Sequence, residues 1–95
     1  MNSYTIRIEL KGQTEKMRIE LLFAMMDNGF SSNVVCDGDF TYALPLNEFV
    51  CVGPEKITSL MNRILRLLGN ITENPVILIT RSEERCWSGL RVINL

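Results

Sequence analysis

The sequence contains no histidine, only three cysteines and three prolines, and its formal net charge is −1 at pH 7. Without histidine, the most common general base near neutral pH is missing. Cys36, Cys51 and Cys86 lie far apart and form no CxxC pair, which argues against a zinc site and against a disulfide framework. The small net charge excludes a strong overall field that attracts nucleic acid. We therefore expect no metal ion and no other cofactor.

Long apolar segments are also missing. The longest apolar run, residues 21–26, is far too short to cross a bilayer. The N-terminal segment MNSYTIRIEL has neither the basic region nor the apolar region of a signal peptide. We expect a cytoplasmic protein with reduced thiols and without a membrane partner.

The apolar content predicts one domain. The chain has 95 residues, 46% of them hydrophobic, which is enough for one core without disulfides or metal. No linker, repeat or low-complexity run interrupts it, so residues 1–95 form a single predicted domain. Residues 82–95 are interpreted as a C-terminal tail of this domain, with Trp87 either anchoring the tail or offering a platform on which a base stacks.

Local patterns predict the helices and strands. Apolar and polar residues alternate from Tyr4 to Lys11, which indicates a half-buried strand. Thr14 suits a helix N-cap, Pro54 suits the first helical position, and apolar residues follow both at helical spacing. Residues 40–44 could extend a hairpin, although Pro45 argues for an edge or a loop. The predicted helices are 14–28 and 54–68, and the further predicted strands are 32–36, 47–52 and 76–80.

The predicted order βαββαβ is typical of the ferredoxin-like plait, a four-stranded antiparallel sheet with two helices on one face. The strands at 47–52 and 76–80 are apolar on both faces. If bare, the open face of the sheet would expose an apolar patch of the kind that marks an interface. We expect the tail or a second subunit to cover this face, the latter forming a homodimer. Ile19, Leu22, Phe23 and Met26 widen the apolar stripe of the first helix, which predicts contacts on more than one side of it.

The middle of the chain resembles a known family. The string MMDNGFSSNVV at residues 25–35, followed by Asp37-Gly38, Leu44-Pro45 and Asn47-Glu48-Phe49, is similar to the GhoS-like family. Members of that family are antitoxin endoribonucleases of type V toxin–antitoxin systems. The similarity extends to residues 4–9 and so covers most of the chain. It implies an endoribonuclease that acts on single-stranded mRNA without a bound cofactor and has no DNA partner.

The resemblance points to Glu9 as the catalytic residue. RNA cleavage without histidine needs a carboxylate, tyrosine or lysine as the base, with cations that stabilise charge developing on the phosphate. Glu9 matches an acidic residue that the family carries near the end of its first strand. The alternative is that Glu9 is a solvated strand residue that pairs with Arg7 or Lys11.

Basic side chains supply the candidate RNA contacts. Arg63 and Arg66 share the predicted exposed side of the second helix and suit phosphate, although a solvated helix face has the same pattern. The family has basic residues in the second half of its first helix, where this chain has Glu20 and Leu22. The candidate RNA-binding residues are Arg7, Lys11, Arg63, Arg66 and Arg81.

Two other functions fit the sequence. The first is a non-catalytic module that binds a protein or RNA through the open sheet face. The second is a dimeric plait that senses a small molecule in a pocket at the dimer interface. A nuclease requires a charged groove and turnover, whereas a binding module requires only an exposed apolar or basic patch.

Overall fold

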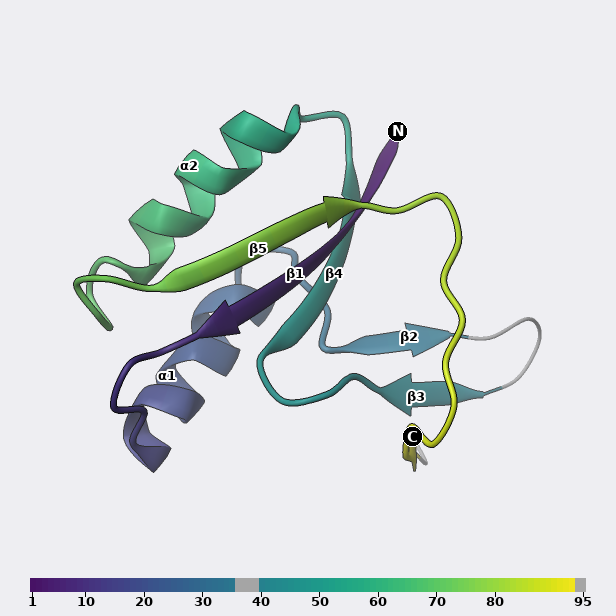
Figure 1. Ribbon diagram of the computed structural model, residues 1–95, viewed down its shortest axis with the longest axis horizontal. Coiled ribbons are helices and arrows are strands. Elements are labelled where there is room, and N and C mark those ends of the chain that lie inside the picture. The colour runs from purple at the N-terminus through teal and green to yellow at the C-terminus, as the bar shows by residue number, and fades with distance from the viewer. Residues whose placement is uncertain (36–39, 94–95) are drawn as a thin grey trace.

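The chain forms two helices and two antiparallel sheets of three strands each in a computed structural model, which describes residues 1–35 and 40–93 (Figure 1). The larger sheet has the strand order β4-β1-β5, and the smaller sheet has the order β2-β3-β6. The elements are β1 (Asn2–Glu9), α1 (Glu15–Met26), β2 (Asn33–Val35), β3 (Thr41–Ala43), β4 (Glu48–Gly53), α2 (Ile57–Leu68), β5 (Val76–Arg81) and β6 (Val92–Ile93).

Strand β1 is the centre of the larger sheet and of the core. Its alternation places Tyr4, Ile6 and Ile8 on one face, where each is at most 1% exposed. Ile6 lies between Phe49 of β4 and Ile79 of β5 in the sheet register. Both helices cover this face and add buried apolar side chains from α1 and α2 to the same cluster. The predicted half-buried first strand is confirmed.

Helix α1 begins after the predicted N-cap Thr14 and ends at Met26, two residues before the predicted end. The hydroxyl of Thr14 accepts a hydrogen bond from the backbone N–H of Met17 at 3.1 Å, which satisfies one free donor of the first turn. After the helix, Gly29 adopts a φ of 89°, a left-handed conformation that costs glycine little. Phe30 then donates its N–H to the carbonyl of Met25 at 3.1 Å and buries its ring. This C-terminal turn directs the chain back toward the sheet.

The predicted single sheet of four strands is wrong. After α1 the chain makes one bridge to the larger sheet, in which Ser31 and Val50 exchange backbone hydrogen bonds of 2.9 and 2.8 Å. It then leaves that sheet, and β2 pairs with β3 instead, with Val34 opposite Tyr42. Within the segment 40–44, residues Thr41–Ala43 form strand β3, which ends before Pro45, a residue that cannot donate to the ladder. Cys36, at the end of the predicted second strand, and the Asp37-Gly38 turn lie outside the described residues.

The C-terminal segment packs on the domain. It leaves β5, crosses to the smaller sheet and adds β6 beside β3 (Figure 1). The backbone N–H of Ser82 donates to the carbonyl of Ser3 at 2.8 Å. The ring centroid of Trp87 lies 5.7 Å from that of Tyr42, so Trp87 anchors the tail on the smaller sheet.

The outer face of α1 differs from the prediction. Ile19, Phe23 and Met26 are 40, 60 and 51% exposed, so the described part of the chain does not bury this side of the helix. Among the described residues, no helix has the length and apolar character needed to span a membrane.

Candidate functional site

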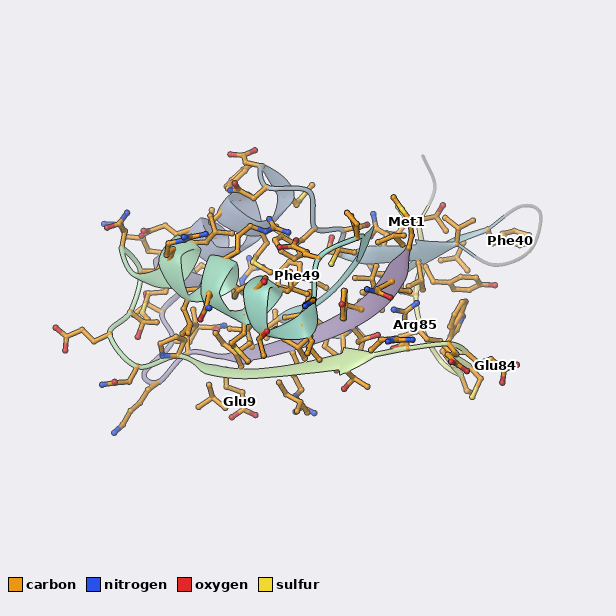
Figure 2. All side chains as sticks on the ribbon, turned by 90° about the horizontal axis from the view of Figure 1, so that it is seen from above. Met1, Glu9, Phe40, Phe49, Glu84 and Arg85 are labelled. Carbon is orange, nitrogen blue, oxygen red and sulfur yellow. The ribbon has the colours of Figure 1, made fainter. Side chains whose placement is uncertain are left out.

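The candidate catalytic residue lies on the face of the larger sheet opposite the helices. Because side chains alternate along a strand, Arg7 and Glu9 of β1 point away from the core. Figure 2 shows Glu9 beneath the sheet, with the helices above it. In the register, Arg7 lies between Glu48 of β4 and Leu78 of β5, and Glu9 lies opposite Val76 of β5.

Arg7 and Glu9 form a loose ion pair. The Nη2 atom of Arg7 lies 3.7 Å from Oε1 of Glu9, and the two side chains are 62 and 65% exposed. A pair this exposed adds little to stability. Because both side chains are exposed, they are also accessible to a ligand. Lys11 is exposed in the turn that follows β1. The sheet therefore brings together a carboxylate and a guanidinium, with an ammonium group close along the chain.

An open hollow of about 290 Å³ lies beside this pair and is lined by Arg7, Glu9, Val76 and Leu78. The two apolar side chains are 58 and 62% exposed. Among the residues that the structure describes, the expected cover is present only at the other end of the face, where Arg85 of the tail contacts Thr5 and Ser3. The uncovered end is thus the part of this face that a partner can reach.

Arg85 holds the tail over the covered end of the sheet face. Sequence reasoning did not find this role. Its Nε donates to Oγ1 of Thr5 at 2.6 Å, and its Nη2 donates to the hydroxyl of Ser3 at 3.1 Å. Glu83 and Glu84 stand beside Arg85 in the sequence, yet these hydrogen-bond acceptors come from the opposite end of the chain. Local sequence carries no signal for a contact across 80 positions.

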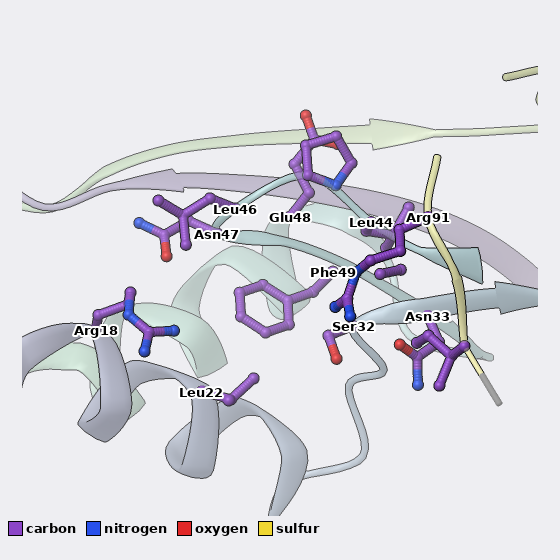
Figure 3. A pocket seen from close by; sticks show the side chains of 13 residues that line it. Arg18, Leu22, Ser32, Asn33, Leu44, Leu46, Asn47, Glu48, Phe49 and Arg91 are labelled. Carbon is purple, nitrogen blue, oxygen red and sulfur yellow. The ribbon is translucent and has the colours of Figure 1, made fainter. Parts of the chain in front are cut away.

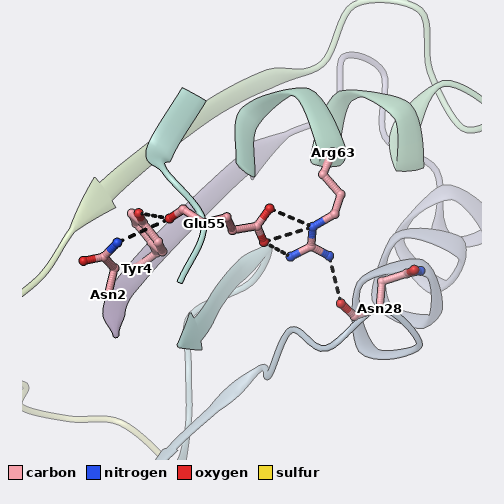
Figure 4. Close-up of polar contacts among 5 residues, drawn as sticks. All are labelled: Asn2, Tyr4, Asn28, Glu55 and Arg63. Atoms are coloured by element: carbon pink, nitrogen blue, oxygen red, sulfur yellow. Dashed lines mark hydrogen bonds and ion pairs between the residues drawn. The ribbon is translucent and has the colours of Figure 1, made fainter. Parts of the chain in front are cut away.

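Arg63 does not face the solvent as predicted. Its Nε and Nη2 donate to Oε1 of Glu55 at 3.1 and 2.6 Å, and its Nη1 donates to the carbonyl of Asn28 at 3.1 Å (Figure 4). The guanidinium carbon also lies 4.7 Å from the ring centroid of Phe30. The backbone carbonyl of the same Glu55 accepts a hydrogen bond from the hydroxyl of Tyr4 at 2.6 Å. Arg63 therefore links α2 to the end of α1, and its guanidinium is engaged by groups of the protein itself.

The other predicted RNA contacts lie apart from Glu9. Arg66 is exposed in the last turn of α2. Arg81 is exposed at the end of β5, opposite Tyr4 in the register and so on the helix side of the sheet. Only Arg7 and Lys11 share the neighbourhood of Glu9, and the predicted basic residues do not line one groove.

The cysteines differ in their surroundings. Burial raises the pKa of the Cys51 thiol on β4, with nearby Arg63 opposing the shift. Cys86 in the tail is exposed. Within residues 1–35 and 40–93, no three or more histidine, cysteine or acidic side chains gather as a metal site would require.

No protein-family model matches the chain, and no curated protein matches it.

Proposed function

We propose that the protein is a cytoplasmic endoribonuclease of the GhoS-like kind, which cleaves single-stranded RNA at the uncovered end of its open sheet face. The observation that carries this proposal is the exposed Arg7–Glu9 pair, with 3.7 Å between the guanidinium and the carboxylate. The pair supplies a proton acceptor and a phosphate-binding cation side by side, the minimum that cleavage by the RNA's own hydroxyl requires.

The chemistry follows from these two groups. Glu9 takes the proton of a ribose 2′-hydroxyl, whose oxygen then attacks the adjacent phosphorus. The bond from phosphorus to the 5′-oxygen breaks, the leaving oxygen takes a proton from water, and a 2′,3′-cyclic phosphate remains. Arg7 stabilises the added negative charge on the phosphate oxygens. The route needs no metal ligand, in keeping with a sequence that has no Cys/His cluster and no paired-carboxylate motif.

The fold is consistent with this family. We propose that the larger sheet and its helices form the core of a ferredoxin-like plait whose fourth strand is reduced to the bridge at Ser31 and Val50. The strand order β4-β1-β5, two helices on one face, and a bridge at the outer edge of β4 support this description.

The test is cleavage of single-stranded oligoribonucleotides in EDTA by purified protein. Glu9→Gln should lower the rate about a hundredfold or more, the usual contribution of a general base, while RNA affinity stays within about twofold. Arg7→Ala and Lys11→Ala should weaken binding and reduce its salt dependence by about one unit of slope for each phosphate that the variant no longer neutralises. Glu73→Gln, in the loop before β5, is the matched control.

Two outcomes would contradict the nuclease. The first is no cleavage by the unaltered protein across a panel of RNAs, which contradicts the activity itself, and the second is full activity of the Glu9→Gln variant, which contradicts the role of Glu9 as the base. A cyclic phosphate at the product end, detected by mass spectrometry, is the expected signature of the route.

A second function, a non-catalytic protein-binding module, is favoured by the composition of the same face. Val52, Val76 and Leu78 are 67, 58 and 62% exposed there. No aromatic side chain among the described residues of β1, β4 and β5 points to this face, although RNA-binding sheets commonly stack bases on aromatics. The partner would be another protein or a second copy of this chain. Leu78→Glu should then abolish association in light scattering, and an unchanged complex would exclude this surface.

A further inference from the structure

The outer face of α1 carries a continuous line of exposed side chains, which we call the α1 stripe. Its three apolar members are 40, 60 and 51% exposed, and an exposed lysine and an exposed aspartate stand at its two ends. Because an α-helix has about 3.6 residues per turn, these positions share one side of the helix, opposite the buried Leu21 and Met25. The members of the α1 stripe are Lys16, Ile19, Phe23, Met26 and Asp27.

The other sides of α1 have contacts within the protein. Leu21 and Met25 belong to the main core, and Leu22 lines a cavity of about 410 Å³ between α1 and the smaller sheet (Figure 3). The guanidinium of Arg18, which also lines that cavity, donates to the carboxylate of Glu15. The α1 stripe is therefore the side of the helix that the described residues leave uncovered.

The two charges of the α1 stripe lie at the ends of the helix that its own dipole disfavours. Lys16 is in the first turn, beside the free N–H groups, and Asp27 is the C-cap, beside the free carbonyls of a last turn that contains no basic residue. Cations are favourable at the C-terminus of a helix, and anions are favourable at its N-terminus. The ion pairs among the described residues include neither Lys16 nor Asp27, so none of them compensates this placement.

A second copy of α1 that runs antiparallel to the first compensates both charges. Lys16 of each copy then lies beside the C-terminus of the other helix and opposite its Asp27, and the contact occurs twice because a two-fold interface is self-complementary. The same register brings Ile19 of one copy beside Phe23 of the other, so that exposed apolar side chains cover one another. Glu20 borders the α1 stripe, at the solvent edge of such a pair.

We propose that the protein forms a homodimer in which the α1 stripes of two copies pack antiparallel about a two-fold axis. The charge pattern selects a second copy as the partner, because a cation at one end of the stripe and an anion at the other end match the same stripe reversed. One helix face buries less than the roughly 800 Å² per partner of a standard interface, so we expect a reversible dimer with a Kd of about 1–100 μM.

This interface is separate from the open sheet face. Figure 2 shows α1 and Glu9 on opposite sides of the larger sheet. The dimer therefore leaves the Arg7–Glu9 pair of both copies accessible, and it does not rest on the proposed function.

The experiment is sedimentation equilibrium of the full chain at protein concentrations on both sides of the expected Kd. The unaltered chain should change from monomer to dimer. Phe23→Glu should raise the Kd about a hundredfold or more, because it places two carboxylates in the centre of the apolar contact. Leu78→Glu, the same kind of substitution on the open sheet face, is the matched control and should leave the Kd unchanged. Circular dichroism checks that each variant keeps the fold.

Charge reversals test the antiparallel register. Lys16→Glu and Asp27→Lys each place like charges opposite one another twice, and each should raise the Kd about tenfold or more. An equimolar mixture of the two variants should associate with nearly the original Kd, because both positions of each chain then face an opposite charge. Both reversals are favourable to the dipole of their own helix, so neither should unfold the monomer. Glu20→Gln, at the border of the stripe, is the matched control and should not raise the Kd.

Three results would overturn the proposal. The first is a monomer at every concentration, and the second is a dimer that Leu78→Glu abolishes and Phe23→Glu does not. The third is a mixture of the two charge variants that associates as weakly as each variant alone, which rejects the antiparallel arrangement. Association is measured without RNA, so these results are independent of the cleavage assay.

Discussion

At the scale of single residues, equal charges on one helix have different roles. Arg63 and Arg66 both lie on α2, but only Arg63 reaches Glu55, the end of α1 and the ring of Phe30. Because that guanidinium has its hydrogen bonds satisfied inside the protein, it serves the packing of the two helices. Arg66 remains exposed in the last turn, where a cation is favourable to the helix dipole.

Arg63→Ala should therefore destabilise the fold. We expect a loss of about 1–3 kcal/mol in the free energy of unfolding, since charge-assisted hydrogen bonds to a half-buried carboxylate and a cation–π contact disappear together. Urea denaturation followed by circular dichroism measures the loss. Arg66→Ala is the matched control and should leave the midpoint unchanged; equal effects of the two substitutions would contradict the role assigned to Arg63.

The two described cysteines should react at different rates. Iodoacetamide at pH 8 should modify Cys86 first in a Cys36→Ser background, because Cys51 is half-buried and burial raises its pKa, which lowers its thiolate fraction. Peptide mass spectrometry over time measures both rates. Faster modification of Cys51 would show that β4 opens readily at this edge.

The raised pKa of Cys51 also has a consequence for stability. Folding favours the neutral thiol of Cys51. The contribution of this thiol to the free energy of unfolding is therefore complete below the pKa of an unfolded cysteine, and it is lost as pH rises through the raised pKa that Cys51 has in the folded protein. Cys51→Ala should flatten the decline of stability at alkaline pH. The melting temperature measured between neutral and alkaline pH, in the original chain and in the Cys51→Ala variant, tests this.

At the scale of elements, the tail acts as a strap between the two sheets. Arg85 holds its first part to Thr5 on β1, and Trp87 packs on Tyr42 of β3 before β6 joins the smaller sheet. The strap closes one end of the open sheet face and leaves the end with Glu9 accessible. The path of the tail after β5 thus determines which end of the sheet face a ligand can approach.

Trp87→Ala should loosen the smaller sheet. We expect a loss of about 1–2 kcal/mol, because a partly buried indole and its contact with Tyr42 are removed, and faster amide exchange in β3 than in the original chain. Phe40→Ala is a matched control, since Phe40 also faces Tyr42, with centroids 6.5 Å apart, but is 56% exposed. Deletion of residues 86–95 should have the larger effect, and an unchanged melting temperature after deletion would show that the strap contributes nothing.

At the scale of the whole molecule, the core belongs to one sheet. The main cluster of buried apolar residues comes from the larger sheet, the two helices and the segments that adjoin them, and the described residues of β2, β3 and β6 contribute none of its buried members. The smaller sheet has short strands, which are held by backbone pairing and by their contacts with the strap. Stability should therefore be uneven across the molecule.

Native-state hydrogen exchange should show this difference. The amides of β1 and of its paired positions in β4 and β5 should exchange slowest, and those of β2, β3 and β6 should exchange faster through local opening. Exchange at a single common rate across both sheets would indicate that the molecule opens only as one unit.

The sequence by itself determined the features that depend on local periodicity. Alternation along β1 identified its buried face and placed Arg7 and Glu9 together on the other, because strand side chains repeat every two residues. Thr14 marked the start of α1 because the free backbone donors of the first turn need a local acceptor. The order of the helices and the main strands followed from signals of this kind, although α2 begins at Ile57 and not at Pro54, the predicted first helical position.

Only the tertiary structure decided which elements pair and which charges are used. The chain leaves the larger sheet after the bridge at Ser31, Arg63 reaches Asn28, and Arg85 reaches Thr5, all through contacts between residues far apart in sequence. No periodic pattern encodes such contacts, because each depends on how the packed core orients two distant segments. The sequence could therefore name Glu9 as a candidate, but only packing decided that its end of the sheet stays open while the other end is closed.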